Sequence, residues 1–238
     1  MFLDSYFTDH GDAVSISKQQ ASDFAKFVAH DFNPIHDPDA KRFCVPGDLL
    51  FAIITSKIGL RKSMNIAFSG MVTEEKPLRF ARSEAEHLVV TDDAEKTYLK
   101  LSYDAEKNCD LSVIEPLVTS YVQFSGKNFP HILVPLMEKQ GVMLNVQRPL
   151  VMYESMALSL DTLELNAPVV TLADSKIEVN GKRGSSTLYF DIVDQGKVVG
   201  SGKKHMLLSG LIPYEQQGID DLVAAYELRK QQLGLKTA

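Results

Sequence analysis

Apolar residues recur at helical spacing in two segments near the start of the chain. Over residues 17–29 they fall three and four positions apart, and Ser17 followed by Gln20 fits a capping box, so a helix is predicted there. The almost wholly apolar run from Asp48 to Leu60, which follows Pro46–Gly47, predicts a second and buried helix.

The pattern then changes to the shorter period of β-strands. Apolar stretches predict strands at residues 67–69, 86–91, 97–103 and 117–124, and residues 92–96 have the composition of a hairpin connection. This half of the chain therefore predicts a long helix followed by antiparallel strands.

The second half repeats this order. A helix-like segment at residues 131–141 precedes predicted strands at 157–165, 169–179, 186–193 and 197–208, and the apolar spacing after Pro213 predicts a terminal helix. A repeat as long as a domain indicates duplication and fusion. We therefore predict an α+β fold of two units, residues 1–126 and 127–238, that face each other as a pseudo-dimer within one chain.

Composition narrows the classes of function. Hydrophobic residues make up 45% and charged residues 24% of the chain, as in ordinary globular proteins. The net charge of -6 and the lack of long basic clusters argue against nucleic acid as a partner. No stretch is long and apolar enough to predict a membrane span, and residues 1–10 lack the pattern of a signal peptide. We expect a soluble cytoplasmic protein in which Cys44 and Cys109 are reduced thiols and not metal ligands.

The segment A-H-D-F-N-P-I-H at residues 29–36 carries the candidate chemistry. Pro34 fixes its own backbone φ and restricts Asn33, so Asp31 and His36 are held on either side of a rigid turn. A carboxylate and an imidazole placed in this way could converge on one water molecule. Taken alone, the same residues would also fit a turn capped by Asp31, with His36 at the surface.

This segment resembles the signature of the MaoC-like and (R)-specific enoyl-CoA hydratases, proteins of the hotdog fold. Their signature runs Ser or Thr, Gly, Asp, any residue, Asn, Pro, an aliphatic residue and His, and the positions that match here are Asp31, Asn33, Pro34, Ile35 and His36. The chain also looks like members of an uncharacterised proteobacterial family within this superfamily. The resemblance implies a double hotdog, in which each unit wraps an antiparallel sheet around a long helix.

The resemblance also implies a reaction. Asp31 and His36 would orient and deprotonate a water for attack on C3 of a trans-2-enoyl thioester, and then return a proton to C2. The backbone N–H of Gly47, at the start of the buried helix, would stabilise the thioester oxygen, while Asn33 would orient the loop. The expected partner is an acyl thioester of CoA or of acyl-carrier protein, and neither a metal nor another cofactor is expected.

Two departures from the signature keep other functions open. The Gly before the catalytic Asp is replaced by His30, and the His before the Gly at the helix start is replaced by Pro46. The same fold could serve a thioesterase, in which a carboxylate activates water for attack at the carbonyl, or a non-catalytic acyl-CoA-binding or sensing protein. No second copy of the motif precedes the segment around His131, so one pocket per chain is predicted. A homodimer is also possible.

Overall fold

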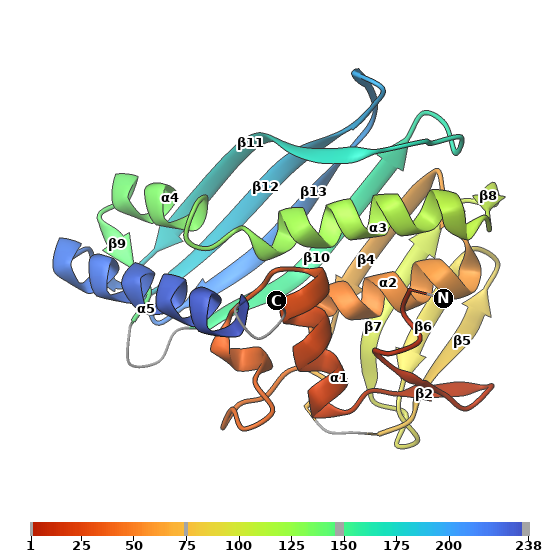
Figure 1. The fold of residues 1–238 in the computed structure, drawn as a ribbon, viewed down its shortest axis with the longest axis horizontal. Helices are drawn as coiled ribbons and strands as arrows, with labels where there is room; N and C mark the ends of the chain where they lie inside the picture. Colours follow the sequence, from red (N-terminus) through yellow and green to blue (C-terminus); the bar gives the residue numbers. More distant parts are fainter. Residues whose placement is uncertain (1, 74–75, 146–149, 235–238) are drawn as a thin grey trace.

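Two long helices, α2 (Gly47–Ile58) and α3 (Leu111–Gly126), lie side by side on one face of a ten-stranded antiparallel sheet (Figure 1). The computed structural model describes residues 2–73, 76–145 and 150–234. Phe51 of α2 meets Tyr121 of α3 edge to face, with 4.9 Å between ring centroids. A single cluster of buried apolar side chains includes residues of both helices and of both halves of the sheet.

The strands have the same order in the two halves of the sheet. From the middle outward the first half runs β4, β7, β6, β5 and the second runs β10, β13, β12, β11, while β2 and β1 extend the first half. The bounds are β1 Thr8–Asp9, β2 Ala13–Ser15, β4 Ser63–Phe68, β5 Leu78–Glu84, β6 His87–Thr91, β7 Thr97–Tyr103, β10 Leu150–Leu160, β11 Val169–Asn180, β12 Arg183–Asp194 and β13 Lys197–Ser209. The repeated order and the two helices confirm the predicted α+β double hotdog.

Side-chain alternation explains how the sheet buries one face. In β12, Leu188, Phe190 and Ile192 are buried and point toward the helices, at the two-residue period of a strand. The two halves join where β4 pairs with β10, from Ser155 opposite Ala67 to Ser159 opposite Ser63. Two small sheets lie apart from the main one and are formed by β3 Leu60–Arg61 with β8 Lys107–Asn108 and by β9 Val142–Met143 with β14 Ile212–Pro213.

The helices of the first half follow the sequence pattern. α1 (Lys18–Asp23) has the predicted capping box between Ser17 and Gln20, and a π-helical turn, η1 (Phe24–Val28), continues it. α2 ends at Gly59, whose φ of 84° lies in the left-handed region that glycine adopts without strain. Both helix predictions in this half are therefore confirmed.

The strand predicted at residues 117–124 is wrong, because this segment belongs to α3. Its buried residues fall at helical spacing and include Ile114, Leu117, Val118, Tyr121 and Val122. Pro116 lies inside the helix, and β-branched residues follow it, so that a short window of sequence favours a strand.

The helix predicted at residues 131–141 exists as α4 (Leu133–Lys139), but it is short and is not the long helix of the second half. The division at residues 126 and 127 stays a prediction. α3 packs against β11, where the Val170 N–H donates to Ser120 Oγ at 2.8 Å, and these contacts favour a boundary ahead of α3.

The predicted terminal helix is confirmed as α5 (Gln216–Gly234), and it lies against the motif loop of the first half. Tyr226 meets Phe32 and Phe129 edge to face, with centroid distances of 6.2 and 5.4 Å. Arg229 pairs with Asp37. Among the described residues, no helix is long and apolar enough to cross a membrane.

Candidate active site

The motif loop begins where the π-helical turn ends. The Ala29 N–H donates to the Phe24 carbonyl at 3.0 Å, and the Asp31 N–H donates to the Ala25 carbonyl at 2.7 Å. His30 between them has a φ of 55°, a left-handed conformation that glycine adopts without strain and other residues adopt at a cost. Because the His30 side chain is exposed, it does not press on the core at this turn of the loop.

A short 3-10 turn, η2 (Pro34–His36), then returns the chain toward Asp31. The Asn33 side chain caps this turn by accepting from the Ile35 N–H at 3.1 Å. The Asn33 N–H in turn donates to Asp31 Oδ1 at 2.9 Å. Asn33 thus orients the loop through its side chain and the carboxylate through its backbone N–H.

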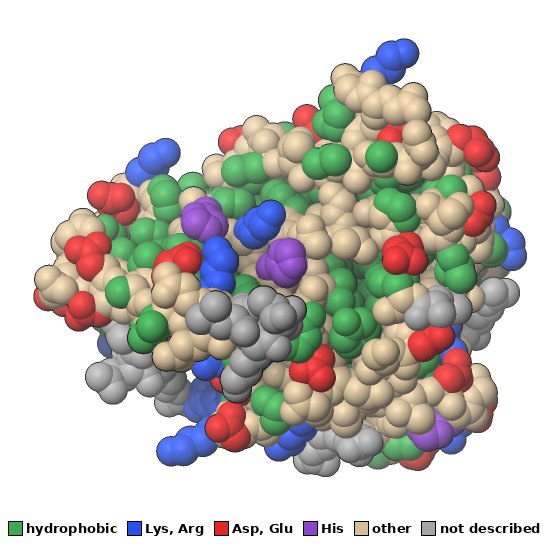
Figure 2. Space-filling view, in the orientation of Figure 1, with side chains coloured by type: hydrophobic (Ala, Val, Ile, Leu, Met, Phe, Trp, Pro, Cys, Tyr) green, Lys and Arg blue, Asp and Glu red, His purple; other side chains and the backbone are tan. Residues whose placement is uncertain are grey.

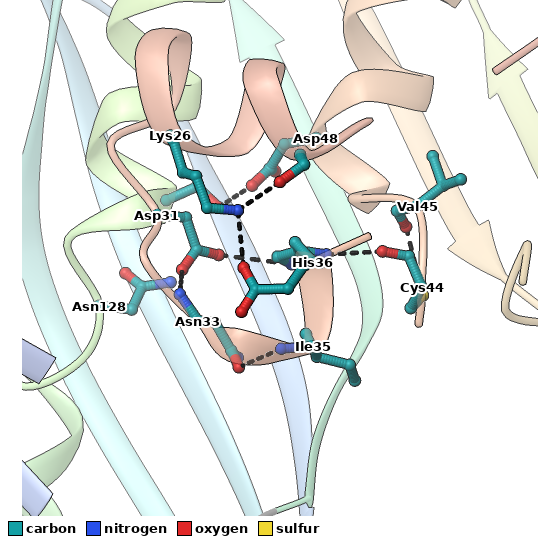
Figure 3. Close-up of polar contacts among 12 residues, drawn as sticks. Lys26, Asp31, Asn33, Ile35, His36, Cys44, Val45, Asp48 and Asn128 are labelled. Carbon is teal, nitrogen blue, oxygen red and sulfur yellow. Dashed lines mark hydrogen bonds and ion pairs between the residues drawn. The ribbon is translucent and has the colours of Figure 1, made fainter. Parts of the chain in front are cut away.

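Asp31 and His36 face one another across the turn (Figure 3). His36 Nε2 lies 3.5 Å from Asp31 Oδ2, and His36 Nδ1 lies 2.7 Å from the Cys44 carbonyl oxygen. Because a carbonyl oxygen only accepts, Nδ1 carries a hydrogen and Nε2 is the nitrogen that faces the carboxylate. The loop therefore fixes both the position and the tautomer of the imidazole.

The surroundings of Asp31 favour its ionised form. Burial raises the pKa of Asp31, but the hydrogen bond and charge of His36, the Asn33 N–H and the charge of Lys204 together outweigh it. The pKa of Asp31 lies below its ordinary value as a result. Asp31 is an anion near neutral pH and can act as a proton acceptor.

Gly47 stands at the first position of α2, beside this pair. Its N-cap residue is Pro46, which makes no side-chain capping bond; the Pro46 carbonyl accepts from the Leu49 N–H at 3.1 Å, and the N–H groups of Gly47 and Asp48 precede this first bond of the helix. A Cβ on Gly47 would lie 3.0 Å from the Tyr153 ring and 3.1 Å from the Phe68 ring. The half-buried Gly47 is therefore closely packed on one side, at an uncapped helix start.

The structure adds a buried polar chain that the sequence reasoning missed. Ser125 Oγ of α3 donates to Asp48 Oδ2 of α2 at 2.5 Å, and the Lys204 ammonium of β13 donates to Ser125 Oγ. All three side chains are buried. The Lys204 nitrogen also lies 4.2 Å from the centroid of the Tyr153 ring. This chain connects the two halves of the protein next to the motif.

The buried chain is coupled to the motif through its charges. Burial raises the pKa of Asp48 and lowers the pKa of Lys204, while the charge of each group opposes the effect of burial on the other. The charges of Asp31 and His36 also act on Asp48, which places it close to the candidate pair (Figure 3). Within the described ranges, Asp48 Oδ1 is buried and has no hydrogen-bond partner.

Two signals in the sequence could have revealed these residues. Asp48 is the one acidic residue of α2 and stands at the start of its long apolar run. An aspartate is rarely buried unless its carboxylate is paired. Lys204 lies two and four residues before the buried Met206 and Leu208 of β13, so its side chain points to the same, buried face of the sheet. The neighbouring Lys203 and His205 are polar as well, so the sequence around Lys204 resembles a solvent-exposed strand end.

α3 ends directly against the motif loop. A Cβ added to Gly126 would lie 2.0 Å from the Ala29 carbonyl oxygen and 3.1 Å from the Asp31 nitrogen. Such contacts are impossible, so this close approach requires glycine. The second half of the chain thus supports the backbone that carries Asp31.

Other candidate groups have more ordinary surroundings. Burial raises the pKa of Cys44 to about 12, which makes it a packing thiol and a poor nucleophile. His205 contacts Thr187, Ser185 and Glu154 on the side of the sheet away from the helices. In the described parts of the chain, no group of three or more His, Cys, Asp or Glu side chains could hold a metal ion.

Fold and site together define a double hotdog protein with a carboxylate–imidazole pair at the start of one central helix. The chain belongs to the family described as protein of unknown function (DUF3581), whose model matches residues 1–217. A comparison with curated proteins gives no match.

Several solved structures are similar over most of the chain. A conserved hotdog-fold protein from Alicyclobacillus acidocaldarius is 7% identical, covers 90% of this chain and 99% of its own, and has a TM-score of 0.48. An acyl-CoA thioesterase II from Mycobacterium marinum is 11% identical over 90% and 100%, with a TM-score of 0.44. The peroxisomal multifunctional enzyme type 2 of Drosophila melanogaster is 9% identical over 82% and 48%, with a TM-score of 0.43.

Proposed function

We propose that this protein hydrates trans-2-enoyl thioesters, or dehydrates the corresponding 3-hydroxyacyl thioesters, on CoA or acyl-carrier protein. The observation that carries the proposal is the facing pair of Asp31 Oδ2 and His36 Nε2, 3.5 Å apart, with the imidazole tautomer fixed by Cys44. The similarity of residues 29–36 to the hydratase signature supports the same reaction.

The pair has the arrangement needed to activate a water. Once His36 has given up the Nε2 proton with which it binds the Asp31 carboxylate, Nε2 and the carboxylate are two facing acceptors, and a water molecule can donate one hydrogen to each. Asp31, which is ionised, takes a proton as the water oxygen bonds to C3. The electrons of the double bond move toward the thioester carbonyl, and return of the proton from Asp31 to C2 completes the hydration without net loss or gain of protons.

The start of α2 provides a place for the charge that develops on the thioester oxygen. An N–H at an uncapped helix start is a favourable donor to an oxyanion, and the helix dipole adds to its effect. Gly47 offers this donor without a side chain in the way. The replacement of His by Pro46 removes a side chain from this position and leaves the backbone donors of Gly47 and Asp48.

The structure of the motif supports one active pocket in each chain. Asp31 and His36 belong to the first half, while Gly126 and Lys204 of the second half form a wall behind them. We propose that a non-hydrolysable acyl-CoA analogue binds with a stoichiometry near one per chain, whether or not two chains associate. We also propose that the protein acts in the cytoplasm.

Product analysis tests the reaction. Purified protein is incubated with crotonyl-CoA and longer enoyl-CoA substrates, and both enoyl absorbance and free thiol are followed. Loss of absorbance without thiol release is the expected result. Thiol release with the double bond intact would instead identify a thioesterase that uses Asp31 at the carbonyl. Tight binding of acyl-CoA without turnover of either kind would identify a sensing or carrier role.

A further inference from the structure

A second feature, a large open cleft, lies on the outer side of the motif loop. It has a volume of about 850 Å³ and is formed by the η1 turn, the motif loop, the segment after α3 and the last turns of α5. His30 and Phe32, the neighbours of Asp31 on either side, both line it. On the face shown in Figure 2, histidine and lysine side chains gather in this region, between α4 and α5.

The cleft is basic in a protein whose net charge is -6. Its charged lining residues are Lys26, Lys127, Lys230 and Glu227. Lys26 already pairs with Asp37 at 2.8 Å, whereas the contact of Lys230 with Glu227 is exposed and long, at 3.7 Å. Since exposed pairs of this kind are weak, Lys230 stays available to an anion, as does the exposed Lys127.

The cations converge on one place. The pKa of His30 is lowered first by burial and then by the charges of Lys127 and Lys230. His30 lines the cleft together with both of these lysines, one after α3 and one on α5. His131 lines the same cleft, so up to two imidazoles can join the two lysines around a bound anion.

An aromatic side chain lies open beside these cations. Phe27 is 43% exposed, one of the few large apolar side chains at the described surface, and it lines the cleft. Behind it, Tyr226 packs edge to face on Phe32, and burial together with the charge of Asp31 raises the pKa of Tyr226 to about 12, so it stays neutral. An open ring next to converging cations suits a ligand that carries a flat base and phosphate groups.

We propose that this cleft binds the phosphorylated adenosine end of coenzyme A, with the phosphates on Lys127 and Lys230 and the adenine on Phe27. The choice of coenzyme A rests on the proposed function, because the cleft borders the loop that holds Asp31. The arm of the same molecule that carries the thioester must then extend past the motif loop to reach the candidate pair. The chain then recognises the nucleotide end with residues that take no part in the reaction.

Calorimetry with adenosine 3′,5′-bisphosphate, which has no thioester, tests the cleft alone. The full chain should bind it, and the double variant Lys127→Met with Lys230→Met should bind at least about tenfold more weakly, because two charge-assisted contacts are lost. Phe27→Ala should weaken binding by a smaller factor. Lys139→Met is the matched control, since Lys139 is an exposed lysine of α4 outside the cleft and its variant should bind like the wild type.

Proton NMR of the imidazole signals gives an independent readout. A bound phosphate favours the protonated imidazole, so the pKa of His30 should rise when the bisphosphate is added and should not change in the double variant. Equal binding by the double variant and the wild type, or no change at His30, overturns the proposal.

The same variants separate this inference from the proposed reaction. If the bisphosphate binds as expected but no enoyl thioester is turned over, the cleft stands and the hydratase function fails. If enoyl N-acetylcysteamine is hydrated while the bisphosphate does not bind, the function stands and the cleft assignment fails. Loss of activity on enoyl-acyl-carrier protein with unchanged activity on enoyl-CoA in the double variant would also overturn it, because the cleft would then serve an acidic carrier protein.

Discussion

The starts of the two central helices show how similar halves of one fold have come to differ. α3 begins at Asp110, whose side chain accepts from the Ser112 N–H at 2.9 Å and so satisfies the helix start. α2 begins at Pro46, which makes no such bond, and the motif loop lies beside it. One helix start is therefore capped by a side chain of its own sequence, and the other is not. This difference makes the start of α2, and not that of α3, the place where the proposed reaction is best tested.

The largest expected effect comes from the motif. Asp31→Asn and His36→Gln should each reduce turnover of an enoyl thioester by roughly 10²- to 10⁴-fold, because a positioned general base is lost. The melting temperature should change little, since both side chains lie on a polar loop at the edge of the core. Steady-state kinetics and thermal unfolding measure the two effects. His87→Gln, an exposed histidine of β6, is the control, and a motif variant that kept most of its activity would show that the pair is structural.

The buried chain between the halves should dominate stability. Asp48→Asn or Lys204→Met alone should lower the free energy of unfolding by about 3–5 kcal/mol, because each leaves the other buried group without its charge partner. The double variant should be more stable than either single variant. Denaturant unfolding of the four proteins measures this cycle. Additive losses in the double variant would mean that the two groups do not depend on one another.

Filling the open helix start should have an intermediate effect. Gly47→Ala places a methyl group 3.0–3.1 Å from the Tyr153 and Phe68 rings, so the rings or the helix start must shift. We expect a loss of about 1–3 kcal/mol of stability from overpacking and a fall in kcat with a smaller change in KM. Full activity in this variant would show that the helix start accepts a methyl group without a shift that matters to the reaction, and that glycine is not required at this position.

Removing the cap of the closed helix start should have the smallest effect. Asp110→Ala loses one N-cap bond at an exposed position, so the melting temperature should fall by only about 2–4 °C. Activity should be retained, because α3 begins far along the chain from the motif and its start has no role in the proposed reaction. A strong loss of activity would show that both helix starts take part.

The sequence predicted the candidate pair because its geometry is local. Pro34 and Asn33 shape six consecutive residues, and no distant contact is needed to bring Asp31 toward His36. The terminal helix and most strands were also predictable from apolar periodicity. The buried chain was not, since Asp48, Ser125 and Lys204 come from three elements and meet only in the folded protein.

α3 shows a different limit of sequence reasoning. Its apolar residues have helical spacing over its whole length, but Pro116 interrupts the segment and its second half is rich in residues that favour strands. Burial between α2 and β11 outweighs these local preferences. A strand predicted in place of α3 makes α4 look like the counterpart of α2 in the second half, whereas the long helix that corresponds to α2 is α3.

The antiparallel pairing of β4 with β10 also limits how a substrate can enter. The two halves share one continuous hydrogen-bonded ladder at their junction, so they cannot swing apart like domains on a flexible linker without breaking it. Any opening must instead come from pieces that lie outside the ladder. α5 is such a piece, because it is held at the motif by the Tyr226 and Arg229 side chains and is not part of the hydrogen-bonded ladder. Any movement that opens the motif loop to a ligand is therefore expected in α5 and not in the sheet.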